Sequence, residues 1–182
     1  IIAIAVKAYD GGPVFYLQDR LTYKGKEFRI RKFRSMCVDS EKNGARLASK
    51  HDSRITPVGH VLRNLHLDEL PQLFNVFMGD MSLVGPRPER KTIMREYEKE
   101  LPEFYYRLKV KAGLTGYAQV YGKYNTTPYD KLKLDLFYIE NYSFLLDIKL
   151  IFMTVKIFFQ KEVSEGVDDK QVNALKDSGR TA

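Results

Sequence analysis

The alternation of polar and apolar positions in this 182-residue chain predicts strands near the N-terminus and helices after residue 56. Residues 27–33 (EFRIRKF) alternate polar with apolar side chains, which is typical of a strand with one buried face. Residues 14–17 form a second, short apolar run, and the sequence KGK at 24–26 lies between the two runs. Two strands around a glycine turn predict a small antiparallel hairpin, with Arg29 and Arg31 on a basic face.

Helical spacing of apolar residues is the dominant pattern after this hairpin. A helix is predicted to begin at Thr56-Pro57, because threonine can cap a helix and proline suits its first turn. Further helices are predicted over residues 46–50, 67–77, 89–100 and 127–141. The helix at 67–77 is expected to bend or to start near Pro71. Residues 107–111 are predicted as a strand and 113–116 as a loop between glycines. The predicted fold class is α+β: mostly helical, with one small antiparallel β-hairpin.

Residues 143–160 are strongly hydrophobic but also contain Asp147, Lys149 and Lys156. An ionised side chain at the centre of a bilayer costs roughly 2.5–3.5 kcal/mol on insertion scales, which disfavours a membrane-spanning role. An amphipathic helix that lies in the membrane interface fits better, because its lysines can extend toward the lipid head groups. A buried core helix is the alternative that the sequence leaves open.

The two ends of the chain differ from the part between them. Residues 1–6 form an apolar stub that is too short to span a bilayer, which needs about 20 residues. Because the stub begins in the middle of a hydrophobic pattern, we interpret it as the end of a truncated membrane helix. Residues 7–161 are predicted to form one folded domain that carries the candidate chemistry. Residues 162–182 are predicted to be a polar, disordered tail.

Composition narrows the classes of partner. Lysine and arginine number 30 against 23 acidic residues, which gives a net charge of +7. Such an excess favours nucleic acid, anionic lipid or phosphorylated small molecules, although it also fits a solubilising surface. The single cysteine, Cys37, excludes an internal disulfide and a cysteine-based zinc site. The sequence contains no Walker loop, dinucleotide fingerprint, HExxH motif or serine elbow.

Two adjacent carboxylates, Asp68 and Glu69, are the strongest candidates for chemistry. Neighbouring carboxylates repel each other, so a fold tends to keep them together where cations or a metal offset the repulsion. Carboxylates bind Mg²⁺ together with phosphate oxygens, and an aspartate can attack phosphorus itself. The alternative is a charged first turn of a helix, where acids interact favourably with the helix dipole.

Arginines flank this acid pair in the sequence. Arg63 precedes Asp68, and Arg87 lies between Pro86 and Pro88, where the backbone has little freedom. A guanidinium binds phosphate oxygens bidentately, and a rigid loop lowers the cost of ordering it. Each arginine alone also fits a solvated surface group. Together with the acid pair, the arginines indicate chemistry on a phosphate ester.

Seven motifs extend this pattern over most of the chain. They are GPVF at 12–15, KFRSM at 32–36, DSRIT at 52–56, LDELPQLFNV at 67–76, GDMSLVGPRP at 79–88, GLTGYAQV at 113–120 and SFLLD at 143–147. In this order, the motifs resemble those of the polyprenyl-phosphate sugar-1-phosphate transferases. This family is also known as the bacterial sugar transferases or monotopic phosphoglycosyl transferases.

The resemblance implies an enzyme that transfers a sugar-1-phosphate from a nucleoside diphosphate sugar, usually a UDP-sugar, to polyprenyl phosphate. It implies that Asp68 is the nucleophile, which forms a covalent phosphosugar intermediate and contacts Mg²⁺. By the same resemblance, Glu69 either supports this nucleophile or acts as a base. The implied basic and hydrogen-bonding residues of the site are Lys32, Arg34, Arg63, Gln72, Asn75 and Arg87.

The resemblance also implies a setting at the membrane. The family carries an N-terminal re-entrant membrane helix, and residues 1–6 look like the end of one whose remainder is missing from this chain. The expected partners are the two substrates and a membrane surface, at the cytoplasmic face of the inner or plasma membrane. No nucleic-acid partner is expected, and a homo-oligomer stays open. A non-catalytic basic module that binds membrane or nucleic acid is the alternative.

Two positions depart from the family pattern. Ala112 stands where proline is usual before GLTG, and His66 stands where a small hydroxyl residue is commoner. Neither position belongs to the acid pair, so we expect an active enzyme when the chain is complete. The sequence identifies neither the sugar nor the order of the chemistry, which is either covalent transfer or direct attack in a ternary complex.

Overall fold

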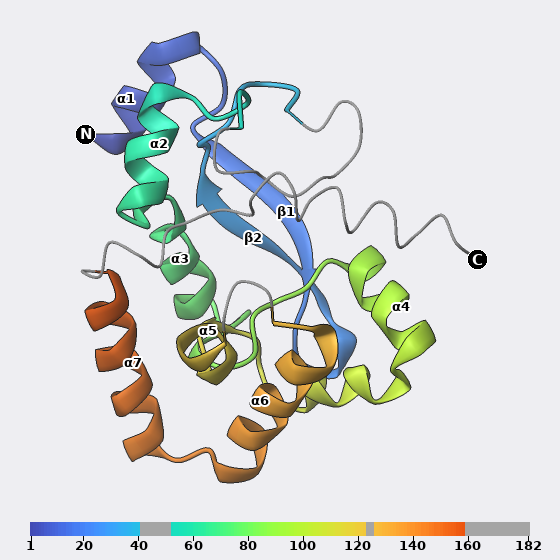
Figure 1. The fold of residues 1–182 in the computed structure, drawn as a ribbon. Coiled ribbons are helices and arrows are strands. Elements are labelled where there is room, and N and C mark those ends of the chain that lie inside the picture. Colours follow the sequence, from blue (N-terminus) through green and yellow to red (C-terminus); the bar gives the residue numbers. More distant parts are fainter. Residues whose placement is uncertain (41–51, 123–125, 159–182) are drawn as a thin grey trace.

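The computed structural model describes residues 1–40, 52–122 and 126–158. An antiparallel hairpin of β1 (Phe15–Leu21) and β2 (Glu27–Phe33) crosses the middle of the molecule (Figure 1). The helix α1 (Ile2–Asp10) lies near one end of this hairpin, and α4 (Lys91–Glu100) lies near the other. The apolar N-terminal stub is thus the first part of a helix that continues to Asp10.

The hairpin follows the predicted alternation of side chains. Its register runs from the pair Phe15 and Phe33 to the pair Leu21 and Glu27. Along β2 the side chains alternate between exposed and buried positions, with Ile30 in the core. The predicted hairpin is therefore confirmed, although its first strand continues to Leu21 instead of ending at residue 17.

Short helices and two further strands follow the hairpin. Thr56 caps the first of these helices, because its hydroxyl accepts a hydrogen bond from Gly59 N at 2.9 Å. The elements are α2 (Pro57–Asn64), the 3₁₀ helix η2 (Leu67–Glu69), α3 (Gln72–Phe77), β3 (Ser82–Val84), α4, the 3₁₀ helix η3 (Pro102–Lys109), β4 (Gly113–Thr115), α5 (Tyr117–Tyr121), α6 (Pro128–Asn141) and α7 (Phe144–Phe158). The helix predicted to begin at residues 56–57 is confirmed as α2, and those predicted at 89–100 and 127–141 are confirmed as α4 and α6.

The predicted strand at residues 107–111 is wrong. Arg107 belongs to η3, and the strand of this region is β4, which pairs in parallel with β3. The predicted loop at 113–116 is therefore mostly a strand. The pairing brings two backbones very close, since a Cβ on Gly113 would lie 2.1 Å from Gly85 N. The glycines that suggested a loop are thus required by the close approach of two strands.

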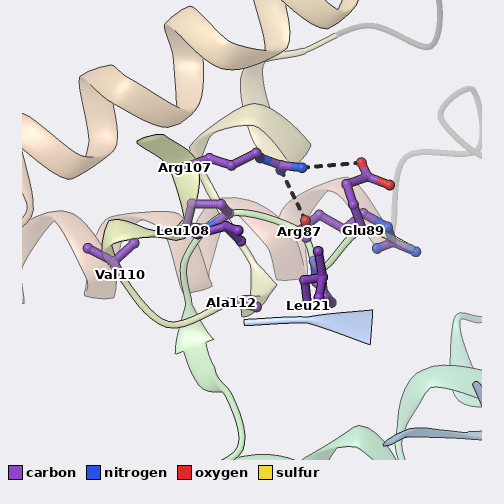
Figure 2. A pocket seen from close by; sticks show the side chains of 9 residues that line it. Leu21, Arg87, Glu89, Arg107, Leu108, Val110 and Ala112 are labelled. Atoms are coloured by element: carbon purple, nitrogen blue, oxygen red, sulfur yellow. Dashed lines mark hydrogen bonds and ion pairs between the residues drawn. The ribbon is translucent and has the colours of Figure 1, made fainter. Parts of the chain in front are cut away.

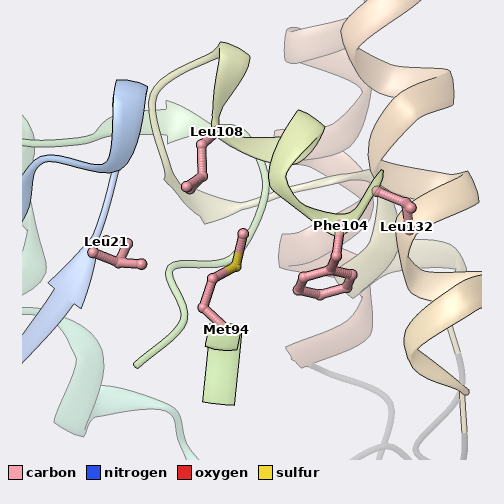
Figure 3. Close-up of a cluster of buried hydrophobic side chains, with 5 residues drawn as sticks. All are labelled: Leu21, Met94, Phe104, Leu108 and Leu132. Atoms are coloured by element: carbon pink, nitrogen blue, oxygen red, sulfur yellow. The ribbon is translucent and has the colours of Figure 1, made fainter. Parts of the chain in front are cut away.

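Three clusters of buried hydrophobic side chains form the core. The cluster in Figure 3 joins the end of β1 to α4, η3 and α6 through Leu21, Met94, Phe104, Leu108 and Leu132. Complete burial of a side chain of this size contributes roughly 1.5–3 kcal/mol. Leu21 and Leu108 of this cluster also line a small pocket together with residues 86–89, so the cluster lies next to the segment that leads from β3 to α4.

The helix α7 carries apolar residues on both its buried and its exposed sides. Leu150 is completely buried, whereas Phe144, Leu145 and Phe152 are 78%, 79% and 71% exposed. A helix that is buried on all sides is thereby excluded. Among the described residues, no helix has both the length and the apolar character needed to cross a bilayer. The predicted helix at 46–50 and the predicted tail at 162–182 lie outside the described residues.

Candidate active site

Asp68 and Glu69 lie on η2, a single 3₁₀ turn between α2 and α3. His66, just before this turn, has a left-handed backbone conformation with φ of 53°, which is unusual for a residue with a side chain. The chain therefore leaves α2 abruptly, and α3 begins after Pro71. The break predicted near Pro71 is confirmed, since it separates η2 from α3. Both carboxylates are partly exposed just before this break.

Glu69 is held by two cations from separate segments. Its Oε1 atom accepts a hydrogen bond from Lys32 Nζ on β2 at 2.6 Å and another from Arg87 Nη2 at 2.8 Å. Burial opposes ionisation of this carboxyl, but the charges of Arg87 and Lys32 outweigh burial and hold the pKa of Glu69 well below its usual range. Glu69 is therefore ionised throughout the physiological pH range.

The neighbouring Asp68 has the opposite electrostatic character. Burial, and then the negative charge of Glu69, raises the pKa of the Asp68 carboxyl, although Lys32 and Arg63 oppose the rise. Within residues 1–40, 52–122 and 126–158, no group donates a hydrogen bond to this carboxylate. Its lone pairs are thus available, and a carboxylate of raised pKa is the more basic and more nucleophilic member of the pair.

The structure brings three of the predicted basic residues toward the acid pair. Lys32 and Arg87 bind Glu69 directly, and the charge of Arg63 acts on Asp68. Arg63 donates no hydrogen bond to either carboxylate in the part of the chain that the structure describes. The cationic environment that the sequence predicted is therefore present, with Lys32 and Arg87 in contact and Arg63 farther out.

The two predicted amides, Gln72 and Asn75, are both buried side chains of α3. Asn75 is completely buried, and its Oδ1 accepts a hydrogen bond from Arg31 N at 3.1 Å, while its Nδ2 donates to Arg29 O at 3.0 Å. These bonds join α3 to the part of β2 that carries Lys32. Gln72 is 2% exposed, and its Nε2 has no hydrogen-bond partner among the described residues.

Arg34 lies apart from the other predicted basic residues. Its Nε donates to Pro13 O at 2.7 Å, and its Nη1 donates to Asp10 Oδ2 at 2.6 Å. The side chain is 7% exposed, so these partners occupy a buried guanidinium. Arg34 thus joins the end of α1 to the start of the hairpin. Its expected part in phosphate binding stays a prediction that this geometry does not support.

Comparison with known proteins agrees with the motifs. A family model described as "Bacterial sugar transferase" matches residues 1–161. The chain belongs to the bacterial sugar transferase family. The resemblance inferred from the motifs is confirmed.

Several curated proteins are similar to this bacterial sugar transferase. UDP-N-acetylgalactosamine-undecaprenyl-phosphate N-acetylgalactosaminephosphotransferase of Aeromonas hydrophila is 45% identical over 157 residues, which cover 85% of this chain and 37% of that protein. UDP-glucose:undecaprenyl-phosphate glucose-1-phosphate transferase of Klebsiella pneumoniae is 43% identical over 160 residues, which cover 85% and 34%. A protein of the same name from Xanthomonas campestris is 44% identical over 167 residues, which cover 88% and 34%. The chain thus spans about a third of the length of these relatives.

The two departures from the pattern of the bacterial sugar transferases have structural consequences. Ala112 is buried, and its backbone N–H donates to Thr22 Oγ1 at 3.1 Å, a bond that proline could not make. The ring of His66 stacks on Phe158 of α7, with ring centroids 4.6 Å apart and an interplanar angle of 19°. The residue that turns the chain before the acid pair is therefore in contact with α7.

Sequence reasoning missed two residues that contact the loop of Arg87 in this bacterial sugar transferase. Arg20 Nη1 donates to Pro88 O, and Arg107 Nη2 donates to Arg87 O, each at 3.0 Å. Figure 2 shows Arg107 in a small pocket behind this loop, with its guanidinium directed at the Arg87 carbonyl and at Glu89. The register of the hairpin places Arg20 on the same face as Lys32, but this placement becomes visible only when β1 is known to continue past residue 17.

The donor set at Asp68 fits a magnesium ion that is shared with a substrate. The described residues contain no group of three or more His, Cys, Asp or Glu side chains that could hold a metal by themselves. Mg²⁺ is usually bound through one or two carboxylates together with phosphate oxygens. Among the described residues, no hydrogen-bond donor occupies the Asp68 carboxylate oxygens, which is what this mode of binding requires.

Proposed function

We propose that this domain transfers a sugar-1-phosphate from a UDP-sugar to polyprenyl phosphate through a covalent intermediate on Asp68. The observation that supports this most strongly is that the two adjacent acids have opposite environments. Lys32 and Arg87 compensate the negative charge of Glu69, whereas no described residue donates a hydrogen bond to Asp68, which can therefore act as a nucleophile. The names of the relatives suggest the substrates, which are a UDP-sugar and undecaprenyl phosphate. Since these relatives use different sugars, the proposal leaves the sugar open. The product would start a membrane-linked glycan.

In the first transfer, a carboxylate oxygen of Asp68 attacks the phosphorus that bears the sugar. A bond forms between this oxygen and phosphorus, and the bond from phosphorus to the nucleotide phosphate breaks. UMP leaves with the bonding electron pair, so that negative charge develops on its phosphate. Glu69 is the residue next to the nucleophile, and it binds the side chains of Lys32 and Arg87. These two cations can therefore offset the charge on the leaving phosphate.

In the second transfer, a phosphate oxygen of the polyprenyl phosphate attacks the same phosphorus. The bond between phosphorus and the Asp68 oxygen breaks, and the carboxylate is regenerated with its electron pair. The products of the two transfers are UMP and a polyprenyl-diphosphate-linked sugar. Asp68 is the residue that would hold Mg²⁺, and this ion would supply further positive charge for the donor diphosphate.

Glu69 acts in this proposal as an anchor for cations. A carboxyl whose pKa is held low by two cations has little tendency to accept a proton, so it makes a weak base. By accepting both hydrogen bonds on one oxygen, Glu69 keeps Lys32 and Arg87 together beside Asp68. Of the two roles that the resemblance left open, the geometry favours the supporting one.

We further propose that the domain binds the membrane surface through one apolar face. The helices α2, α3 and α7 lie along one side of the molecule in Figure 1, and each of them or its end carries large exposed apolar side chains. The members of this face include Val61, Leu65, Phe74, Phe77, Met78, Phe152 and Phe158. A surface of large exposed apolar residues is typical of a membrane or partner interface, and a lipid-linked acceptor favours the membrane. The expected location is the cytoplasmic face of the inner or plasma membrane.

The experiment that tests the proposed function measures UMP release and covalent adducts together. The protein is incubated with Mg²⁺ and a panel of UDP-sugars, with and without undecaprenyl phosphate. We expect UMP release with at least one sugar, and without acceptor a sugar-phosphate adduct that peptide mass mapping assigns to Asp68. Asp68→Asn should abolish both signals. An adduct that persists in Asp68→Asn would exclude this residue as the nucleophile, and UMP release that requires both substrates at once would favour direct attack.

A further inference from the structure

We infer that Arg20 and Arg107 are positioning residues that clamp the backbone of residues 86–89 and thereby hold the Arg87 guanidinium at Glu69. The inference rests on the proposed function, in which Arg87 offsets phosphate charge beside the nucleophile. The hydrogen bonds of both residues go to the backbone that carries Arg87, so they act through this arginine.

The carbonyl groups of residues 86–89 accept four hydrogen bonds, which come from three parts of the chain: the end of β1, η3 and the start of β4. Because residues 86 and 88 are prolines and lack an N–H group, carbonyls are the main anchors that this backbone offers. Two bonds come from backbone amides, and two come from guanidiniums. They are Gly113 N to Pro86 O (2.9 Å), Arg107 Nη2 to Arg87 O (3.0 Å), Arg20 Nη1 to Pro88 O (3.0 Å) and Leu21 N to Glu89 O (2.9 Å).

Arg20 is itself fixed on the inner face of the hairpin. Its Nε and Nη2 donate to Gln18 Oε1 at 2.9 and 2.5 Å, and Gln18 Nε2 donates to the Tyr16 hydroxyl at 2.6 Å. These three residues alternate along β1, and Tyr16 is the cross-strand partner of Lys32. Tyr16, Gln18 and Arg20 thus form a hydrogen-bonded row that begins beside Lys32 and ends at the backbone of residues 86–89, which carries Arg87.

Arg107 is fixed by two carboxylates. Its side chain is 2% exposed; Nε donates to Asp135 Oδ2 at 2.9 Å, and Nη1 lies 3.3 Å from Glu89 Oε1. Figure 2 shows the guanidinium between Glu89 and the Arg87 carbonyl. A guanidinium with several charged partners in a dry setting has a defined orientation. The N–H group that Arg107 directs at Arg87 O is therefore fixed in position.

The clamp matters because the Arg87 side chain is long and 42% exposed. Its Nη2 atom donates to Glu69 Oε1 at 2.8 Å, so the geometry of this contact depends on where the backbone places the start of the side chain. A displacement of about 1 Å in a group that contacts the reacting centre can lower a rate by roughly 100-fold. Two side chains that fix consecutive carbonyls therefore set how well Arg87 meets the developing charge.

Arg20→Met is the first test, because it removes every donor while keeping a side chain of similar length. We expect kcat for UMP release to fall roughly 10- to 100-fold, with a smaller change in KM for the UDP-sugar. Arg20→Lys, which keeps one donor, should recover part of the loss. Arg29→Met is the matched control, since Arg29 lies on the outer face of β2 with a side chain that is 65% exposed. We expect this control to keep wild-type kcat.

A double-mutant cycle with Arg87→Ala separates positioning from a general structural effect. If Arg20 acts through Arg87, Arg20→Met should change kcat/KM less than about threefold once Arg87 is absent. The same result is expected for Arg107→Lys, which keeps the charge that Asp135 needs but cannot satisfy all partners of the guanidinium. Equal fold losses in both backgrounds would overturn the inference.

A second readout keeps the inference distinct from the proposed function. A wild-type protein that releases no UMP with any donor would refute the proposed function. The same cycle measured on UDP binding by calorimetry then decides the positioning role alone. If the double variant Arg20→Met/Arg87→Ala binds UDP no more weakly than Arg87→Ala alone, the positioning role is supported. If the fold losses in affinity of the two single variants multiply in the double variant, the positioning role is overturned.

Discussion

Removing Asp135 should destabilise the domain far more than removing Glu27, although each carboxylate pairs with one basic side chain. Asp135 lies 2.7 Å from Arg107, and the two side chains are 1% and 2% exposed. Glu27 pairs with Lys91, and these side chains are 49% and 53% exposed. Loss of one partner from a buried pair leaves the other charge without compensation, which costs about 3–5 kcal/mol. An exposed pair contributes only about 0–1 kcal/mol.

The remaining contacts of Arg107 place the expected loss at the lower end of this range. In Asp135→Ala, Arg107 keeps Glu89 at 3.3 Å and its bond to the Arg87 carbonyl. We therefore expect a loss of about 3 kcal/mol in the free energy of unfolding for Asp135→Ala and less than about 1 kcal/mol for Glu27→Ala. A small domain is stable by roughly 5–15 kcal/mol, so the buried variant should still fold.

Urea unfolding followed by far-ultraviolet circular dichroism measures both losses at neutral pH. The double variant Arg107→Met/Asp135→Leu provides an internal check, because it removes both buried charges and should recover part of the stability. It removes the bond to Arg87 O as well, so transfer activity should stay low while stability rises. Equal losses in Asp135→Ala and Glu27→Ala would refute the reasoning that burial determines the strength of these pairs.

Three further predictions concern the charges and the apolar face. Lys32→Met should move the acid limb of the kcat/KM pH profile to higher pH, because the charge of Lys32 lowers the pKa of Asp68. Lys32→Arg keeps the charge and should leave the acid limb in place. An acid limb that does not move in Lys32→Met would contradict the role of this charge. Phe77 is 87% exposed, so Phe77→Asp should weaken binding to anionic vesicles in a flotation assay by about tenfold or more, whereas Leu17→Asp on the hairpin should not. The hydrogen bond from Arg34 lowers the pKa of Asp10 to about 2. Its contribution to stability is therefore complete above pH 3.8 and is lost toward pH 2, so the difference between wild type and Asp10→Asn in urea midpoints should shrink across this window.

The acid pair could be located from the sequence because its chemistry is local. Asp68 and Glu69 are adjacent, and the prolines that restrict Arg87 are its immediate neighbours. The local turn at Thr56-Pro57 was predictable for the same reason, since the capping threonine and the first helical residue are consecutive. Where a motif contains its own physical explanation, the sequence is sufficient.

Features that depend on two distant segments could not be predicted in this way. Gly113 was predicted to lie in a loop, although Gly113 and Gly85 allow the strands β3 and β4 to approach each other. The different pKa directions of Asp68 and Glu69 also require the fold, because the sequence alone does not say which carboxylate meets Lys32. Only the hairpin register and the turn at η2 together decide that the lysine binds Glu69.

The predicted end of β1 shows how the clamp escaped sequence reasoning. After residue 17 the strand becomes polar, with Gln18, Asp19 and Arg20, and a polar run beyond a short apolar one normally indicates a turn or an exposed loop. In the fold, Gln18 and Arg20 instead face the same side as Lys32, where the partner of Arg20 is a carbonyl 68 residues away. Strand formation here depends on cross-strand pairing and on the site that the strand supports, because intrinsic propensity is weak for such residues. A polar strand face directed at a cluster of charges is therefore evidence for a site, even where the sequence pattern favours a loop.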